Sequence, residues 1–353
     1  MNSISEHPVF ARRITASLFL LLAICQPVLG ENVNPTSYSM PNGHGRASGG
    51  DFNYWDLYYT GSGNTSSDGA FLSGGLGDLT DGVIALDNWG VVESVAGDGP
   101  YVGWSNIDPT ISFEFAAPVM LQTVRVHLDD SNFSGGVLPP ESVTVTSGAF
   151  SQTFSVPDPL SGDPFWFDID LQGMTTSSTT LDVTLNRRGE WVFCSEFEFV
   201  GQYVINPNSI LVTRGDYVSG GITEISESDN TDLAIQRGVF DIQSRTEFVI
   251  GGVCPSQLPS GLTVQLEGSV FARSPVIQSI ELFNYDSNLW EEIDSRDATR
   301  FLDSTVFATV TGDVTRFVDP TTAGMEIRIR YQSASQRQQF SSNTDKICWL
   351  IED

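Results

Sequence analysis

The residues best suited to chemistry in this chain are carboxylates placed in glycine-rich turns. Residues 77–82 read Gly-Asp-Leu-Thr-Asp-Gly, and a second polar loop at 129–136 begins with two aspartates. Such a turn can fold carboxylate and carbonyl oxygens around Ca²⁺, which takes roughly 6–8 oxygen ligands. The spacing is not that of an EF-hand, and Asp-Gly is also a common turn pair that needs no metal. Both interpretations of residues 77–82 therefore stay open.

Aromatic and polar residues near these loops suggest sugar recognition. A sugar site combines an aromatic face for stacking with carboxylate or amide oxygens on loops held by a rigid scaffold. The candidate ligand contacts are Trp55, Trp89, Asp129, Asp130 and Asn132. Each also has a structural interpretation, since the tryptophans can pack against the core and the acids can be solvated turn residues.

The sequence offers little support for catalysis. Beyond residue 30 the only histidines are His44 and His127, both interpreted as surface residues, and neither lies in a nucleophile-elbow pattern. Zinc-protease, CxxC, Walker and dinucleotide-binding motifs do not occur. We predict a protein that is not an enzyme and has no catalytic residues. Because paired carboxylates ~5–10 Å apart serve glycosidases, a glycan-active hydrolase or lyase remains an alternative.

The first thirty residues are typical of an export signal. Arg12 and Arg13 precede the apolar run 18–24, which is too short to span a bilayer, and Gly30 is a plausible cleavage point. We therefore predict a secreted or cell-surface bacterial protein with residues 1–30 removed and no transmembrane segment in the mature chain. Leu22-Ala23-Ile24 before Cys25 is similar to a lipoprotein box, but Ile24 is too large for the small residue that such a box needs, so lipidation of Cys25 is only a minor alternative. The formal net charge of −27 disfavours binding to nucleic acid.

Alternating apolar residues predict β-strands throughout. Ile111, Phe113 and Phe115 alternate with polar residues, and Val124, Val126 and Leu128 do the same. Short strands separated by turn signals, without a helix of ten residues, indicate an all-β protein. An Asn-Pro break near 206 separates two such regions. We expect two tandem β-sandwich domains, at 31–203 and 209–353, joined by a linker at 204–208.

The first region resembles the discoidin-like, galactose-binding-domain-like jelly rolls over residues 36–203. The resemblance lies in the order of LTDG (79–82), VGW (102–104), ISFEF (111–115), VRVHLDD (124–130), PPESVTV (139–145) and SEFEFVG (195–201). It implies a module of the kind found in carbohydrate-binding and coagulation-factor-type domains. It also implies a structural Ca²⁺ held by loop carbonyls, by Asp81 and by Glu196 at the start of the last strand. The remaining, mostly backbone, ligands do not align.

The second region resembles a C-terminal module of exported planctomycete-type bacterial proteins. The matching segments are TRGDYVSGG (213–221), ESDN (227–230), QSIELFNYDSNLWEEID (278–294) and DKICWLIED (345–353). That module implies no activity. Because exported proteins can keep disulfides and both residues lie in this half, we predict a bond between Cys254 and Cys348. Cys194 alternates with aromatic residues and is predicted to be a buried thiol.

Together these observations predict a secreted, lectin-like protein that binds an extracellular glycan or cell-surface polysaccharide, with Ca²⁺ ordering its loops. A structural or cell-surface assembly protein without a glycan ligand is the alternative from a different class.

Overall fold

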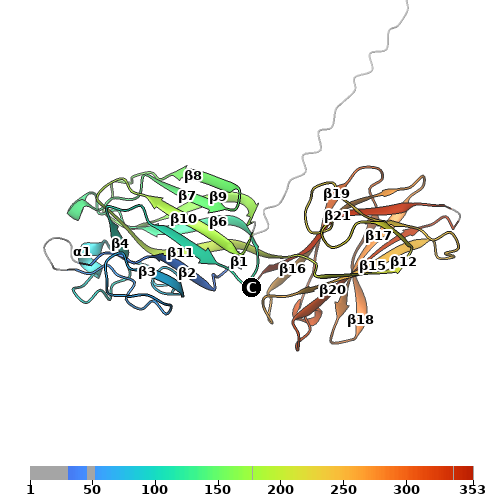
Figure 1. The fold of residues 1–353 in the computed structure, drawn as a ribbon, viewed down its shortest axis with the longest axis horizontal. Coiled ribbons are helices and arrows are strands. Elements are labelled where there is room, and N and C mark those ends of the chain that lie inside the picture. Colours follow the sequence, from blue (N-terminus) through green and yellow to red (C-terminus); the bar gives the residue numbers. More distant parts are fainter. Residues whose placement is uncertain (1–30, 46–51, 177, 337, 353) are drawn as a thin grey trace, which may run out of the picture.

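A computed structural model describes residues 31–45, 52–176, 178–336 and 338–352 of the chain. The predicted signal peptide at 1–30 lies outside the described residues. Two lobes lie end to end, the first built from β1 to β11 and the second from β12 to β21 (Figure 1). Both lobes consist of β-strands, which confirms the predicted all-β fold with two tandem sandwiches. No helix in the described part of the chain is long and apolar enough to cross a membrane.

The first lobe packs one sheet against another. One sheet has the order β3-β2-β5-β10-β7-β8, and the other is built around β11, which pairs with β4, β6 and β1 while β9 flanks β6. Strand bounds are β1 Glu31–Asn32, β2 Ser37–Pro41, β3 Phe71–Gly75, β4 Val102–Ser105, β5 Thr110–Glu114, β6 Val119–Leu128, β7 Ser142–Ser147, β8 Phe150–Ser155, β9 Phe165–Thr175, β10 Thr180–Asn186 and β11 Trp191–Ile205. Two short helical turns, α1 Trp89–Val92 and η1 Ser134–Gly136, lie in the loops.

The core of the first lobe follows the predicted alternation. Ile111, Phe113 and Phe115 are buried, while the residues between them are only partly buried. Phe113 packs against Phe197 and Phe199 of the facing sheet, with ring centroids 5.0 and 4.7 Å apart. These contacts join the two sheets into one hydrophobic core, as expected when successive side chains of a strand point to opposite faces.

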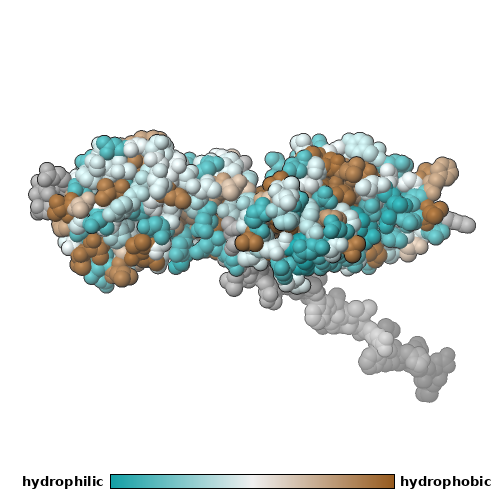
Figure 2. Space-filling model, turned by 90° about the horizontal axis from the view of Figure 1, so that it is seen from below, coloured by the Kyte–Doolittle hydropathy of each residue, from teal (hydrophilic) through white to brown (hydrophobic). Residues whose placement is uncertain are grey.

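The second lobe is also a sandwich. A five-stranded sheet of order β12-β15-β20-β17-β18 faces strands β13, β14, β21, β16 and β19. Strand bounds are β12 Ser209–Arg214, β13 Asp216–Ser219, β14 Leu233–Gln236, β15 Arg245–Val253, β16 Gly261–Phe271, β17 Val276–Asn284, β18 Leu289–Asp297, β19 Ser304–Thr309, β20 Gly324–Ser333 and β21 Ser341–Glu352, with a helical turn η2 at Thr315–Phe317. On the face of Figure 2, apolar residues lie in separate patches on both lobes.

The two lobes share a continuous sheet. The end of β11 pairs with β21, where Tyr203, Val204 and Ile205 lie opposite Ile351, Leu350 and Trp349. Since β11 continues to Ile205, the predicted linker 204–208 begins inside a strand. Backbone hydrogen bonds therefore connect the lobes directly.

The predicted disulfide between Cys254 and Cys348 is wrong, because the Cys348 thiol is free and buried. The two thiols lie on opposite sides of β21. Trp349 and Ile351 point into the main core, which also contains Cys254. Cys348 is one residue out of phase, so it points to the other face and packs with Val204 and Leu350. Cys194 is a buried thiol, as predicted.

Candidate functional site

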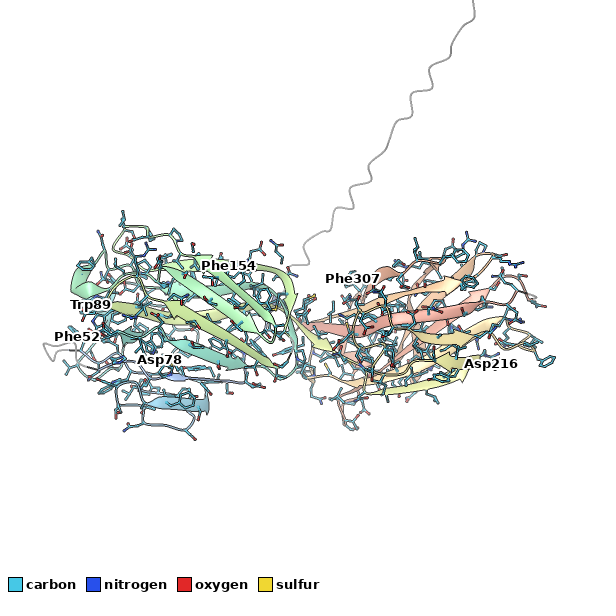
Figure 3. The ribbon with its side chains drawn as sticks, turned by 45° about the horizontal axis from the view of Figure 1, so that its top comes forward. Phe52, Asp78, Trp89, Phe154, Asp216 and Phe307 are labelled. Atoms are coloured by element: carbon cyan, nitrogen blue, oxygen red, sulfur yellow. The ribbon has the colours of Figure 1, made fainter. Side chains whose placement is uncertain are left out.

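An aromatic cluster fills the end of the first lobe that is remote from the second lobe (Figure 3). Tyr54, Trp191 and Phe193 are buried there, and Phe52 and Trp89 cover them while staying partly exposed. The Tyr54 and Phe193 ring centroids are 4.6 Å apart, and those of Trp89 and Phe52 are 5.5 Å apart in an edge-on arrangement. We call these five residues the end cluster. It gives the loops at this end a rigid base.

Trp89 is fixed at both its backbone and its ring. Its backbone N–H donates to Asp129 Oδ2 at 3.0 Å, and its indole N–H donates to the Ser134 carbonyl at 3.3 Å. The Asn88 side chain caps α1 by accepting from the Gly90 N–H. Gly135 has φ 65°, and a Cβ there would lie 2.4 Å from the Trp89 ring. Glycine is therefore required where the loop 129–136 crosses this tryptophan.

Asp129 and Asp130 hold loops together instead of facing solvent. Both are fully buried. Asp129 also accepts from the Ser131 hydroxyl, and burial raises the pKa of its carboxyl to about 7. Asp130 accepts from the N–H of Asn132 and from the N–H of Ser161 at 2.8 Å. The predicted direct contact of these carboxylates with a ligand does not fit this arrangement, because their oxygens already satisfy donors of the loops.

The other predicted contact residues lie in two places. Asn132 is exposed beside the end cluster, with φ 47°, and its neighbour Phe133 is 67 % exposed. Trp55 packs against a different segment, because its indole N–H donates to Asp68 Oδ1 at 2.9 Å and its ring lies against Gly45. The structure thus brings Trp89, Asp129, Asp130 and Asn132 together, whereas Trp55, next to Tyr54 in the chain, turns away to Asp68 and Gly45.

A group of buried acids, of which sequence reasoning missed Asp56, lies farther along the same lobe. Asp56 is fully buried and accepts from the Tyr38 hydroxyl and from the Asp78 N–H. Asp78 is 7 % exposed, and its Oδ2 has no hydrogen-bond partner. Burial raises the pKa of Asp56 to about 6 and that of Asp78 to about 8; the charge of Asp81 raises both pKa values, and the charge of Asp56 also raises that of Asp78. Asp78 belongs to the glycine-rich turn 77–82, whereas no pattern in the sequence pointed to Asp56.

The two residues expected to hold Ca²⁺ lie next to each other at the edge of this group. Glu196 is 3 % exposed, and its Oε2 accepts from the Gly82 N–H at 2.8 Å. Burial raises the pKa of Glu196 to about 8, and the charge of Asp81 adds to the effect. The Thr80 hydroxyl oxygen is buried without a partner, and a pocket of about 130 Å³ borders Thr80, Glu196 and Asn34.

These oxygen donors fit a hard cation. Within the described residues, no three His, Cys, Asp or Glu side chains form a metal-binding cluster. An ion here would therefore need hydroxyl, amide and backbone oxygens besides the carboxylates, and Ca²⁺ accepts such mixed oxygen ligands. An uncompensated buried carboxyl with a raised pKa is also the electrostatic setting that a cation would relieve.

His127 is buried, contrary to the surface position expected from the sequence. It is 4 % exposed, and Trp166 of β9 packs edge-on against its ring. Its Nδ1 lies 2.7 Å from the hydroxyl of Ser195, which also accepts from the Ala85 N–H at 3.4 Å. Burial lowers the pKa of His127 to about 4, so the ring is neutral at pH 7 and its tautomer sets which of the two groups donates. Both side chains are closed off from solvent, so this pair is structural.

Comparison with known proteins places the first lobe in a recognised class. Residues 35–205 match the family model of the discoidin domain-containing receptor 1/2, DS-like domain. The first lobe is a galactose-binding-like jelly-roll module, which confirms the resemblance in the sequence. No comparison connects the second lobe with exported planctomycete-type proteins, and that resemblance stays a prediction. Direct comparison with curated proteins found no match.

Solved structures with related architecture have low identity to this chain. A fucolectin from striped bass (Morone saxatilis) serum is 8 % identical, with a TM-score of 0.31, over 77 % of this chain and 89 % of that one. The tandem CBM22 domains of Paenibacillus barcinonensis Xyn10C are 11 % identical, with a TM-score of 0.29, over 71 % and 90 %. Allantoicase from Saccharomyces cerevisiae is 10 % identical, with a TM-score of 0.27, over 70 % and 80 %. Scores this low support no argument about function.

Proposed function

We propose that this chain is an exported, non-catalytic protein whose first lobe binds a glycan. The observation that carries the proposal is the partly exposed Trp89, held rigidly by the end cluster beside the exposed amide of Asn132. An aromatic face on a fixed base, next to a polar side chain, is the combination that sugar rings require. The match to a discoidin-like domain supports the same conclusion.

Buried Asp129 and Asp130 act indirectly in this proposal. Asp129 fixes the backbone of Trp89, and Asp130 fixes the backbone of Asn132 and ties the 129–136 loop to Ser161. The rim is therefore preorganised, which lowers the entropy lost on binding. Trp55, which follows Tyr54 in the chain, is the proposed second aromatic face for a longer glycan.

Ca²⁺ is the proposed structural ion of this lobe. Glu196, Asp81 and the Thr80 hydroxyl would hold it, together with backbone and amide oxygens. The ion would supply the positive charge that the buried Glu196 carboxyl lacks. Because the pKa of this carboxyl is raised to about 8, Ca²⁺ binding at neutral pH should displace a proton. We expect Ca²⁺ to raise the melting temperature more than Mg²⁺ does, and Glu196→Gln to abolish the difference.

The test of glycan binding uses the whole mature chain, because β11 pairs with β21 and the first lobe is not closed by itself. The chain is passed over a panel of immobilised polysaccharides in Ca²⁺ and again in EDTA. Asn132→Gly removes the amide and keeps the left-handed backbone. Asn106→Gly is the matched control, since Asn106 is also exposed with a positive φ of 57°.

Retention on one glycan class that Asn132→Gly weakens and Asn106→Gly leaves unchanged would support the proposal. Absence of retention by folded protein would refute it. Concentration-dependent assembly without retention would then favour a structural or cell-surface role. Turnover of a polysaccharide that is lost in Glu196→Gln would instead favour a glycan-active enzyme.

A further inference from the structure

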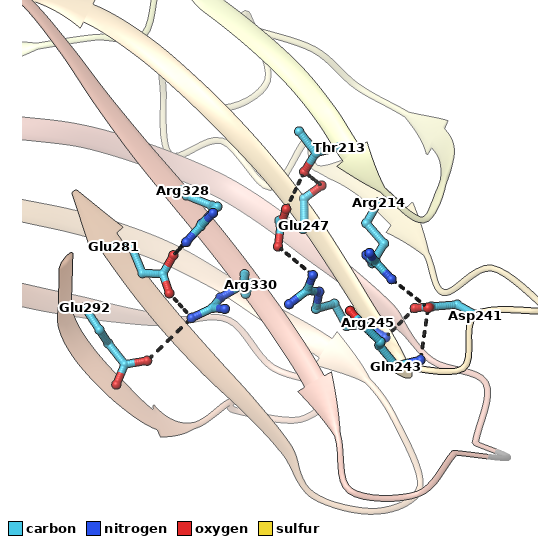
Figure 4. Close-up of polar contacts among 10 residues, drawn as sticks. All are labelled: Thr213, Arg214, Asp241, Gln243, Arg245, Glu247, Glu281, Glu292, Arg328 and Arg330. Carbon is cyan, nitrogen blue, oxygen red and sulfur yellow. Dashed lines mark hydrogen bonds and ion pairs between the residues drawn. The ribbon is translucent and has the colours of Figure 1, made fainter. Parts of the chain in front are cut away.

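The outer face of the five-stranded sheet in the second lobe carries an unusual set of side chains for so acidic a chain. On β20, Ile327, Ile329 and Tyr331 point into the core. The alternate residues Arg328 and Arg330 lie on the outer face, and Arg245 projects from the neighbouring β15 (Figure 4). Gln332, which follows the same alternation on β20, is exposed. The sheet therefore presents several guanidinium groups on one surface of a chain whose formal net charge is −27.

Strand register places long and short side chains in adjacent rows. Gln332 lies between Arg245 on β15 and Ile277 on β17. In the next row Arg330 is followed by Ser279 on β17 and then by Ser295 on β18. Because serine side chains are short, the surface is hollow beside the long arginine and glutamine side chains.

Two adjoining hollows, of about 360 and 480 Å³, result from this arrangement. They share Gln332, Ser333 and Ala334, so they form one continuous depression, which we call the sheet groove. Its remaining lining is Ile277, Ser279, Glu292, Ser295 and Arg330 on one side, and Ile242, Gln243, Arg245 and Gln336 on the other.

The arginines of this face are held in place by carboxylates beside them, since Glu247 lies opposite Arg330 and Glu281 lies opposite Arg328. Glu281, whose side chain is only 4 % exposed, forms ion pairs with both Arg328 and Arg330. Arg245 pairs with Glu247 at 3.4 Å, while its Nε is buried without a hydrogen-bond partner. A guanidinium fixed in this way loses little side-chain entropy when it binds a ligand, and its remaining N–H groups stay available.

Donors predominate in the sheet groove. Guanidinium and amide N–H groups come from Arg245, Arg330 and the glutamines, whereas Glu292 is the one carboxylate among the lining residues and lies 3.8 Å from Arg330. Serine hydroxyls and glutamine amides can also bond to hydroxyl groups. The complementary ligand is rich in acceptors, carries negative charge and bears hydroxyl groups. The small number of apolar lining residues provides no pocket for the side chains of a peptide.

We propose that the sheet groove binds an acidic oligosaccharide, with sugar carboxylates paired to Arg245 and Arg330 and ring hydroxyls bonded to the serine and glutamine side chains. Guanidinium and carboxylate groups match in planar, bidentate geometry. This site lies on the second lobe and does not depend on the glycan site of the first lobe.

The test measures binding of tri-galacturonate, and of neutral galactotriose, to the whole mature chain by isothermal titration calorimetry at about 0.1 M salt. Near this ionic strength charges more than ~10 Å apart are largely screened, so the net charge of the protein does not mask local pairing. Gln332→Glu places a negative charge in the centre of the sheet groove and removes no partner of an existing ion pair. Gln257→Glu makes the same charge change at an exposed position of the second lobe outside the groove.

We expect tri-galacturonate to bind and galactotriose not to bind detectably in the sheet groove. Gln332→Glu should lower the affinity for tri-galacturonate by ~10-fold or more through like-charge repulsion. Gln257→Glu should bind like the unmodified chain. The proposal is overturned if the unmodified chain does not bind tri-galacturonate or if Gln332→Glu binds it equally well. It is also overturned if a hexaglutamate peptide competes as strongly as the sugar. Binding to the first lobe is distinguishable, because Asn132→Gly would reduce it and Gln332→Glu would not.

Discussion

Replacing Asp78 by Asn should stabilise the protein at pH 8 and have little effect near pH 4. Asp78 is 7 % exposed, one of its oxygens has no hydrogen-bond partner, and Asp56 lies beside it. Burial raises the pKa of this carboxyl from 3.8 to about 8. The folded protein therefore holds the proton more tightly than the unfolded chain does between these two pH values.

The sign of the effect follows from proton linkage. Below pH 3.8 the carboxyl is protonated in both the folded and the unfolded state, so its ionisation does not change the free energy of unfolding. As the pH rises toward 8, only the unfolded chain ionises freely, so the free energy of unfolding decreases. Asparagine cannot ionise, so the free energy of unfolding of the variant does not decrease with pH for this reason. Its amide can also donate to a neighbouring carboxylate oxygen.

The size of the gain can be bounded. One pKa unit corresponds to about 1.4 kcal/mol, so the full difference sets an upper limit of about 6 kcal/mol. Relaxation and water penetration reduce such penalties, and part of the shift comes from the charge of Asp56, which is itself coupled to Asp78. We therefore expect a gain of about 1–3 kcal/mol at pH 8, in line with replacing an uncompensated buried charge.

The assay is urea unfolding followed by tryptophan fluorescence, at pH 4 and pH 8, with EDTA present so that no cation compensates the acids. Asp286→Asn is the matched control, because Asp286 is exposed. A variant that is destabilised equally at both pH values would refute the reasoning, since it would mean that the carboxylate is satisfied in the folded state.

Three further outcomes follow from packing. Gly103→Ala should lower the melting temperature strongly in circular dichroism, because its Cβ would lie 1.9 Å from the Phe193 ring; an unchanged melt would contradict this packing. Reducing agent should leave the melting temperature unchanged, because Cys254 and Cys348 are not bridged; a large drop on reduction would show that they are. Val204→Ala should cost about 1–3 kcal/mol and keep a single transition in calorimetry, because this buried valine lies on the strand shared by both lobes; two separate transitions would mean that the lobes unfold independently.

The fold was largely predictable because strand alternation is a local signal. Ile111, Phe113 and Phe115 indicate a buried face without any knowledge of the partner strand, and the structure confirms it. The disulfide was not predictable, because it depends on which face of β21 a residue occupies relative to a distant loop. The fact that two cysteines lie in the same half of the chain does not show which face of a strand each one occupies. Cys348 lies on the face of β21 opposite Trp349.

The site was only partly predictable for a related reason. Loop composition drew attention to Asp129 and Asp130, but composition does not reveal which donors the carboxylates meet, and both turn inward to backbone N–H groups. The sheet groove gave no sequence signal at all. Arg245 and Arg330 are far apart in the chain and come together only through the pairing of β15 with β20.

The continuous strand β11 has a consequence for the two proposed sites. Because Val204 and Ile205 pair with β21, the lobes are joined by backbone hydrogen bonds and by buried contacts instead of a flexible tether. A rigid connection fixes the distance and direction between the end cluster and the sheet groove. A glycan of the right length and shape could then engage both sites with a high effective concentration, whereas one that cannot span them would gain nothing from the second site. The geometry of the joint would thus select among glycans that each lobe alone would accept.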